Sequence, residues 1–233
     1  MTRYVVALAA ALLVVSAPQS RAQHSDSQSA APDLVQMKIA HAEAEAKEKA
    51  QDPAAHYRLG NAYYDAGRVG DAIQAYEQAV DVDSTYKEAL VNLGNAYNET
   101  GKLHEAVLTF EHALRLDPKD DKALSNLGNS YYALGDYTRG MDAYARALQA
   151  NPRCHQAHYN IGVAFADAGI YREAVREWLK VIELAPGTPD AESAMENVKV
   201  IEKILGEKYI NESKSSQGSQ NIPPGAGSHG GAH

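Results

Sequence analysis

The chain has 233 residues and a formal net charge of −8 at pH 7. Because phosphate binding depends on clustered Lys and Arg, and no basic stripe runs along this sequence, we expect no nucleic-acid partner. The single cysteine, Cys154, cannot form an internal disulfide, so packing alone must hold the fold even in an oxidising compartment.

Residues 1–22 have the pattern of a secretory signal peptide. Arg3 precedes an apolar run from Tyr4 to Val15, and small residues follow up to Ala22. The alternative is a membrane anchor, but the run is shorter than the roughly 20 apolar residues that span a bilayer. We therefore expect an exported protein, periplasmic or extracellular, with no stable membrane insertion after cleavage. The Ala and Val content of the signal indicates a bacterial source.

Two segments lead into the main part of the chain. Residues 23–32 are rich in Ser, Gln and Ala and are expected to be a flexible leader. Residues 33–50 are rich in Ala, Glu and Lys, with Leu34 and Met37 toward one face, which predicts a helix. This leading helix either caps the region after it or stands partly free. The alternative is a short coiled coil for oligomerisation, although the segment has few heptads.

A five-residue pattern then recurs with a period of 34 residues. Its first copy is Leu59-Gly60-Asn61-Ala62-Tyr63, and the other copies begin at Leu93, Leu127 and Ile161. Glycines, small residues, aromatics and prolines recur in the same register: Gly67, Gly101, Gly135, Gly169; Ala72, Ala106, Gly140, Ala174; Tyr76, Phe110, Tyr144, Trp178; Ala79, Ala113, Ala147, Val181; and Pro118, Pro152, Pro186. Such a period is the signature of a helical repeat array.

This register resembles the tetratricopeptide repeat (TPR) family. The resemblance implies an all-α fold, a right-handed helical-repeat solenoid of antiparallel helix pairs, the TPR superhelix. It implies four repeats within 53–186, namely 53–86, 87–120, 121–154 and 155–188. It also implies a scaffold that binds other proteins, without saying which.

The residue types of one repeat agree with this fold. Gly94 removes a side chain so that the second helix can approach closely, and Gly101 suits the left-handed turn after the first helix. Pro118 ends the second helix. Since one helix pair cannot bury its own apolar face, each repeat must stack on its neighbours.

The array needs a seal at its end. Residues 189–208 keep the register but carry Met195-Glu196 in place of Leu-Gly and Lys199 in place of Tyr, which predicts a C-terminal capping helix. Residues 209–233 are rich in Ser, Gly, Pro and His and are expected to be disordered; His229 and His233 there are expected to be inert.

No catalytic motif is present, and we expect neither an enzyme nor a cofactor or metal. The densest group of candidate metal ligands is Cys154, His155 and His158. The alternative is that His158 packs at a repeat interface, since it takes the register position of Leu90 and Leu124.

Resemblance to the family implies that one face of each first helix lines a concave groove. An asparagine row at Asn61, Asn95 and Asn129 suits an extended peptide, because each amide offers two donors and an acceptor. The alternative is that these asparagines are common in the repeats whatever is bound. The full set of candidate peptide-binding residues is Tyr57, Asn61, Tyr64, Asn92, Asn95, Asn98, Lys122, Asn129, Tyr132 and Tyr159.

Some TPR proteins hold the C-terminal carboxylate of a chaperone with a clamp of three cations and two asparagines. Asn61, Asn92 and Lys122 match that clamp, but Tyr57 replaces a Lys and Asn126 replaces the Arg. We therefore expect no such clamp.

These patterns lead to a non-enzymatic adaptor that binds a peptide segment of an envelope or secreted protein in the groove. The alternative is a structural scaffold of the cell envelope that self-associates through its repeat ends or its leading helix.

Overall fold

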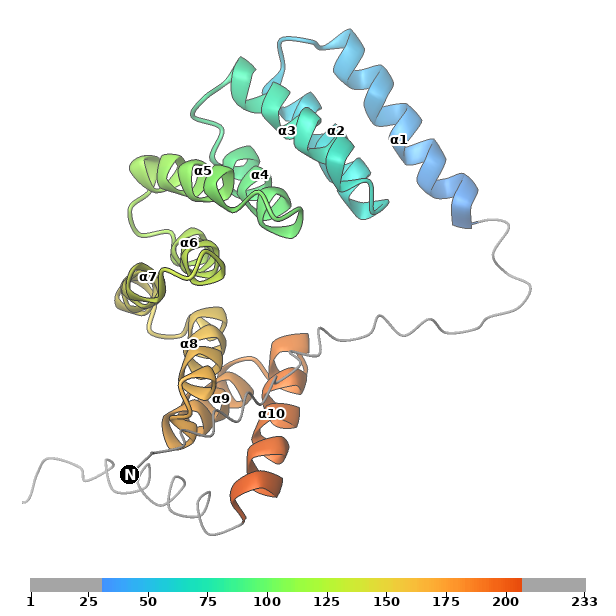
Figure 1. Cartoon of the computed structure of the whole chain (residues 1–233). Coiled ribbons are helices and arrows are strands. Elements are labelled where there is room, and N and C mark those ends of the chain that lie inside the picture. Colours follow the sequence, from blue (N-terminus) through green and yellow to red (C-terminus); the bar gives the residue numbers. More distant parts are fainter. Residues whose placement is uncertain (1–30, 207–233) are drawn as a thin grey trace, which may run out of the picture. The chain divides into compact units, whose positions relative to one another are not determined.

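The computed structural model describes residues 31–206, which form helices and the short turns between them, without a strand (Figure 1). The all-α helical-repeat fold expected from the sequence is confirmed. The signal peptide, most of the leader and the tail from residue 209 lie outside the described residues. The helices are α1 (Ala31–Glu48), α2 (Pro53–Asp65), α3 (Val69–Val82), α4 (Lys87–Glu99), α5 (Leu103–Leu116), α6 (Asp121–Ala133), α7 (Tyr137–Ala150), α8 (His155–Asp167), α9 (Tyr171–Leu184) and α10 (Pro189–Leu205).

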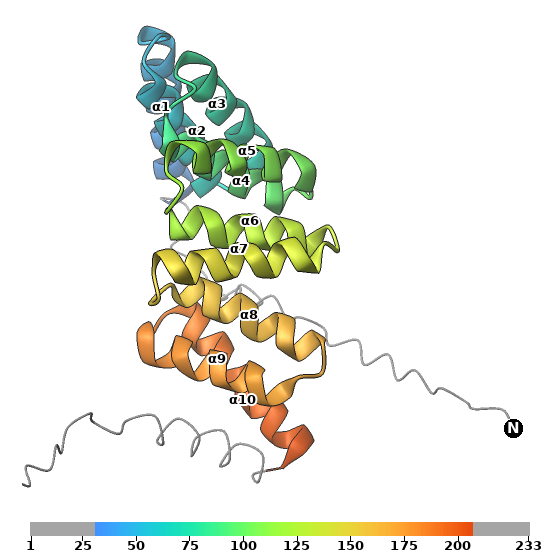
Figure 2. The same cartoon turned by 90° about the vertical axis from the view of Figure 1, so that its left-hand side faces the viewer.

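The chain divides into two compact units between Ala157 and His158, inside α8. In the first unit, each helix from α1 to α6 packs against the next one along the chain. Figure 2 shows α4 with α5 and α6 with α7 as successive layers of this unit. The second unit contains the rest of α8, with α9 and α10, and there α9 packs against α10.

The helix pairs of the repeats are α2 with α3, α4 with α5, α6 with α7, and α8 with α9. In each pair, a glycine of the first helix lies against an aromatic ring of the second helix. A Cβ atom built on Gly94 would lie 2.7 Å from two ring carbons of Phe110, which is too close for any side chain. Gly60 meets Tyr76, Gly128 meets Tyr144 and Gly162 meets Trp178 in the same way. The glycine at this register position is therefore required by the packing of the pair.

α1 belongs to the repeat register, which the sequence had not indicated. Glu43 of α1 precedes Glu77 and Glu111 by one and two periods of 34 residues. These three carboxylates accept hydrogen bonds from the hydroxyls of Tyr63, Tyr97 and Tyr131 respectively, each on the first helix that comes next along the chain. α1 thus contacts α2 as the second helix of one repeat contacts the first helix of the next. It also begins and ends two residues earlier than the expected span of 33–50.

The face of α1 that a preceding first helix would cover is polar. Ala72 and Ala79 of α3 are fully buried. The matching residues of α1 are the exposed Lys38 and the half-buried Glu45, whose carboxylate pairs with Arg58 at 2.8 Å. A further layer would bury these charges, which disfavours its packing on this face, although Leu34, Val35 and Met37 at the start of α1 are exposed apolar residues.

α10 closes the other end in the same manner. Ala191, Ala194 and Val198 are buried in the second unit's core. The positions that would face a further second helix include the exposed Glu196 and Lys199. The helix begins at the Thr188 cap, whose hydroxyl accepts from the Ala191 amide, and it ends at Leu205, before the expected residue 208, because Gly206 has φ +77°.

None of the described helices combines the length and the apolar content needed to cross a membrane.

The packing of Gly94 yields a prediction about stability. Gly94→Ala should lower the free energy of unfolding by about 1–3 kcal/mol, because its methyl group overlaps the Phe110 ring. Gly70→Ala in α3 is the matched control. A Cβ atom at Gly70 would have nothing within 4 Å, so this change should raise stability by about 0.5 kcal/mol. Urea unfolding followed by circular dichroism measures both, and equal effects would contradict the packing argument.

Candidate functional site

Nine of the ten candidate binding residues lie in the first unit, on the sides of α2, α4 and α6 that meet. α4 contacts α6 directly, so first helices of neighbouring pairs touch on this side. We call this surface the groove face. Its residues are Tyr57, Asn61 and Tyr64 on α2; Asn92, Asn95 and Asn98 on α4; and Lys122, Asn129 and Tyr132 on α6.

Asparagine pairs join neighbouring first helices along the groove face. The Asn92 Nδ2 donates to the Asn61 Oδ1 at 3.0 Å, and one period later the Asn126 Nδ2 donates to the Asn95 Oδ1 at 2.8 Å. The sequence had suggested Asn126 only as a departure from the chaperone clamp. Its position one period after Asn92 was the available signal for a repeated structural role.

Tyrosines of the second helices donate hydrogen bonds to asparagines of the row Asn61, Asn95 and Asn129. The Tyr76 hydroxyl donates to the Asn61 Oδ1 at 2.7 Å, and the Tyr144 hydroxyl donates to the Asn129 Oδ1 at 2.7 Å. In the pair between them, Phe110 has no hydroxyl, and the Asn95 Oδ1 accepts from Asn126 instead. Each Oδ1 of the row therefore accepts a hydrogen bond inside the protein.

The other end of each amide bears the two N–H donors of its Nδ2 group. Within the described residues, the Nδ2 groups of Asn61, Asn95 and Asn129 donate to no protein acceptor. The sequence suggested a row with two donors and an acceptor per amide. In the described structure the Nδ2 donors have no protein acceptor, whereas each Oδ1 already accepts a hydrogen bond inside the protein, and the Asn61 Oδ1 accepts two.

Asn98 has a structural role on this face. Its Oδ1 accepts from the Ser130 hydroxyl at 2.8 Å, and Ser130 is fully buried. Because both atoms lie between α4 and α6, Asn98 holds these helices together and offers less to a ligand than the asparagine row does.

The tyrosines of the groove face are held in different ways. The Tyr64 hydroxyl donates to the Glu99 Oε2 at 2.7 Å, and this bond together with partial burial raises the pKa of Tyr64 to about 12. Tyr64 therefore stays protonated at neutral pH, with its side chain 39% exposed. Tyr57 packs edge-on against Tyr86, with ring centroids 5.4 Å apart, and Tyr132 packs against Tyr137 at 4.9 Å.

A hollow of about 200 Å³ opens on the groove face between α2 and α4. Its lining consists of Asn61, Tyr64, Asp65, Tyr76, Asn92 and Asn95. Four of these are candidate binding residues named from the sequence, and the structure brings them together. Asp65 and Tyr76 were not predicted as lining residues. Asp65 is the neighbour of Tyr64 in the chain, and Tyr76 is the aromatic of the same repeat.

The remaining candidate binding residues do not line this hollow. Lys122 is exposed and forms no ion pair within the part of the chain that is described. At the two positions where the chaperone clamp would have further cations, Tyr57 accepts a 3.3 Å hydrogen bond from Asn92 and Asn126 bonds Asn95. Tyr159 belongs to the second unit, where its carbonyl accepts from the Trp178 Nε1 at 3.2 Å.

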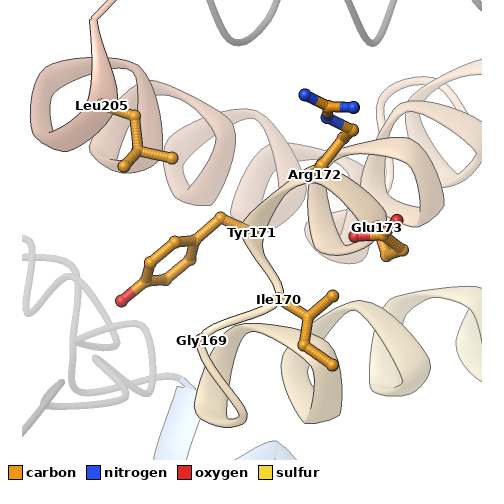
Figure 3. Close-up of a pocket in the computed structure, with 6 residues that line it drawn as sticks. All are labelled: Gly169, Ile170, Tyr171, Arg172, Glu173 and Leu205. Atoms are coloured by element: carbon orange, nitrogen blue, oxygen red, sulfur yellow. The ribbon is translucent and has the colours of Figure 1, made fainter.

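The second unit has a hollow of its own, of about 290 Å³, between the start of α9 and the end of α10. Figure 3 shows its six lining residues: Gly169, Ile170, Tyr171, Arg172, Glu173 and Leu205. Tyr171 and Leu205 come from the two different helices and give the hollow an apolar side. The sequence had suggested none of these residues for binding, although Gly169 belongs to the repeat register.

Cys154 and His158 of the candidate metal cluster are buried in the protein interior. Among the described residues, no three His, Cys, Asp or Glu side chains lie together as metal ligands. Cys154 is 4% exposed, and burial raises the pKa of its thiol to about 11. It is therefore a protonated core residue, although the sequence places it at a repeat seam.

His158 forms a buried pair with a glutamate of α9. Its Nδ1 lies 2.6 Å from the Glu177 Oε2, and Lys180 contacts the other oxygen at 2.8 Å. Burial alone would raise the pKa of Glu177, but the hydrogen bonds from His158 and Lys180 outweigh it and lower that pKa. Glu177 is thus a carboxylate held by two partners.

His56 occupies the same register position as His158 but has a poorer environment. Its Nε2 donates to the Ala50 carbonyl at 3.0 Å. Its Nδ1 is buried and has no hydrogen-bond partner in the described structure. In the two pairs between, Leu90 and Leu124 fill this position and are 1% exposed.

Comparisons with known proteins agree with the repeat register. A family profile described as Tetratricopeptide repeat matches residues 39–86, 57–121 and 125–190. The first match begins inside α1, as expected if α1 is the second helix of an incomplete repeat. No curated protein sequence matches the chain.

Several solved structures have a similar fold. A crystal structure of MamA is 25% identical and has a TM-score of 0.58; the match covers 66% of this chain and 91% of that one. MamA 41-end from Desulfovibrio magneticus RS-1 is 18% identical, with a TM-score of 0.59 and coverage of 69% and 90%. TTC0263, a thermophilic TPR protein in Thermus thermophilus, is 21% identical, with a TM-score of 0.60 and coverage of 72% and 93%.

Replacing each of the two buried histidines by Leu should change the free energy of unfolding in opposite directions. His56→Leu should raise the free energy of unfolding by about 1 kcal/mol, because it removes an unpaired buried nitrogen while water can reach the carbonyl of the exposed Ala50. His158→Leu should lower it by about 1–3 kcal/mol, because Glu177 loses a buried partner. Urea unfolding midpoints measure both, and a shared sign would show that the hydrogen bonds do not decide the outcome.

Proposed function

The chain belongs to the tetratricopeptide repeat family, and from that membership we propose that it is a non-enzymatic adaptor that binds an extended segment of a protein partner along the groove face. The family is one of protein-interaction modules. The observation that carries the proposal is the row of amide donors at Asn61, Asn95 and Asn129, whose Oδ1 atoms are held from within. A fixed row of donors suits a chain of backbone carbonyls.

The energy of such binding is shared among several contacts. One neutral hydrogen bond contributes about 0.5–1.5 kcal/mol net, so three donors alone give weak binding. Tyr64 and Tyr132 add ring surface on the same face, and aromatic contacts contribute further. Because the donors are already oriented, a ligand loses less of its affinity to the ordering of the protein.

We also propose that the partner is an envelope or secreted protein. The support is the signal-peptide pattern of residues 1–22, which indicates export to the periplasm or the cell exterior.

Self-association is the second candidate function, and one observation favours it. Leu34, Val35 and Met37 at the start of α1 are 57%, 41% and 68% exposed. End-to-end stacking of repeat arrays is disfavoured, because it would bury the charged outer faces of α1 and α10. Light scattering over a concentration series separates the candidates, since a persistent monomer counts against the scaffold.

The adaptor proposal is tested by crosslinking in the cell. A photoreactive residue at position 95 should capture a distinct partner protein, because Asn95 lies at the centre of the donor row. The same residue at Leu108 of α5, which is 65% exposed on a second helix, is the control and should capture nothing specific. Mass spectrometry identifies the captured protein. Self-crosslinks from both positions would favour the scaffold, and silence from position 95 would count against the groove.

The donor row itself is tested by an isosteric change. Replacing Asn61, Asn95 and Asn129 together by Asp keeps each Oδ1 acceptor and removes each Nδ2 donor. Capture of the partner should fall about a hundredfold, since three hydrogen bonds are lost, while the unfolding midpoint stays close to that of the parent. Replacement by Ala should lower both, because the internal bonds are lost as well.

The control for added charge makes the same amide-to-acid change elsewhere. Gln74→Glu and Gln78→Glu alter exposed residues of α3 and should leave capture unchanged. If the Asp variant captures as well as the parent does, the amides do not contact the ligand.

A further inference from the structure

We propose that the hollow between α2 and α4 is a subsite for one Lys or Arg side chain of the bound segment. This inference rests on the proposed function, because the same segment must lie along the groove face. It specifies that the bound segment carries a positive charge and where that charge lies on the groove face. The donor row specifies neither.

The hollow is preorganised by hydrogen bonds that do not involve a ligand. Asn61 accepts from both Tyr76 and Asn92, and Tyr64 is tied to Glu99. Its volume of about 200 Å³ admits the end of a long side chain. Since the lining is already fixed, filling it requires little rearrangement of the protein.

The charge of the hollow is negative and uncompensated. Asp65, the last residue of α2, is exposed and forms no ion pair within the described residues. Glu99 does not line the hollow, but its carboxylate accepts a hydrogen bond from the hydroxyl of the lining residue Tyr64. Neither Lys nor Arg is among the lining residues in this part of the structure.

These features select between the classes of side chain that could enter. A carboxylate would be repelled by Asp65, and an apolar group would strip water from Asp65 and leave it unpaired. A cation would pair with Asp65, and its approach along the exposed ring of Tyr64 would gain a cation–π contact. The hollow therefore fits Lys or Arg, and the donors of Asn61 and Asn95 remain for backbone carbonyls on either side.

The corresponding place one repeat later lacks this combination. There Asn98 stands for Tyr64 and bonds Ser130, and Phe110 stands for Tyr76. An acid remains, since Glu99 stands for Asp65, but no aromatic wall equivalent to Tyr64 accompanies it. Within the first unit, this comparison places the basic side chain at the α2–α4 hollow.

The test uses selection of random short peptides against the purified full-length chain, followed by synthesis of the enriched sequences. The enriched peptides should share a Lys or Arg at one position and should lose affinity when Asn129 alone, which does not line the hollow, is changed to Asp. Asp65→Lys should weaken them about tenfold, and changing the shared basic residue to Glu should restore binding to that variant. Lys at a helix C-terminus is favourable, so folding is preserved.

Asp81→Lys is the matched control, because Asp81 is an exposed acid in the last turn of α3 and does not line the hollow. It should leave affinity unchanged. Peptides that depend on the asparagine row but show no basic position, or that bind Asp65→Lys as well as they bind the parent, would overturn the subsite and leave the adaptor proposal standing. If no peptide is enriched, both proposals fail.

Discussion

The close contact between a glycine and an aromatic ring determines how each helix pair packs, and the groove face depends on it. The ring of Tyr76 lies against Gly60, and its hydroxyl continues to Asn61, the next residue along the chain. Tyr144 makes the same two contacts with Gly128 and Asn129. One side chain thus fills the core and orients an amide on the surface, so core packing and the geometry of the site cannot vary independently.

A repeat array has two ends, and this chain treats them alike. α1 supplies the second half of a repeat and α10 supplies the first half of another, and each has charged residues where the missing half would pack. The register between them is set by residues that meet their neighbours across a repeat seam, such as Tyr131 with Glu111. Stability in such a structure comes from contacts between adjacent layers, and sealing the ends prevents further layers from adding.

The period alone was enough to predict the helix pairs and the glycines at which the second helix approaches closely, because each follows from a residue type that recurs. The aromatic ring that lies against each glycine was not predicted. α1 was harder to place in the register, because Ala42 replaces the aromatic of Tyr76, and Lys38 and Glu45 replace buried alanines. Only Val35, Ile39 and Glu43 keep the residue types of α3 there, so the signal was weak. The use of each amide could not be predicted either. Which atom of Asn95 is occupied depends on Asn126, whose approach is fixed only by the packing of two repeats.

The hydrogen bond between asparagines of neighbouring first helices, which we call the joint, affects how such a protein can change in length. Residues 87–120 carry both halves of the joint, since Asn92 donates to the repeat before and Asn95 accepts from the repeat after. If this segment were duplicated in tandem, Asn92 of the second copy would be placed to donate to Asn95 of the first copy at the new seam. The groove face can therefore be lengthened by duplication of one unit, without a compensating substitution elsewhere in the chain.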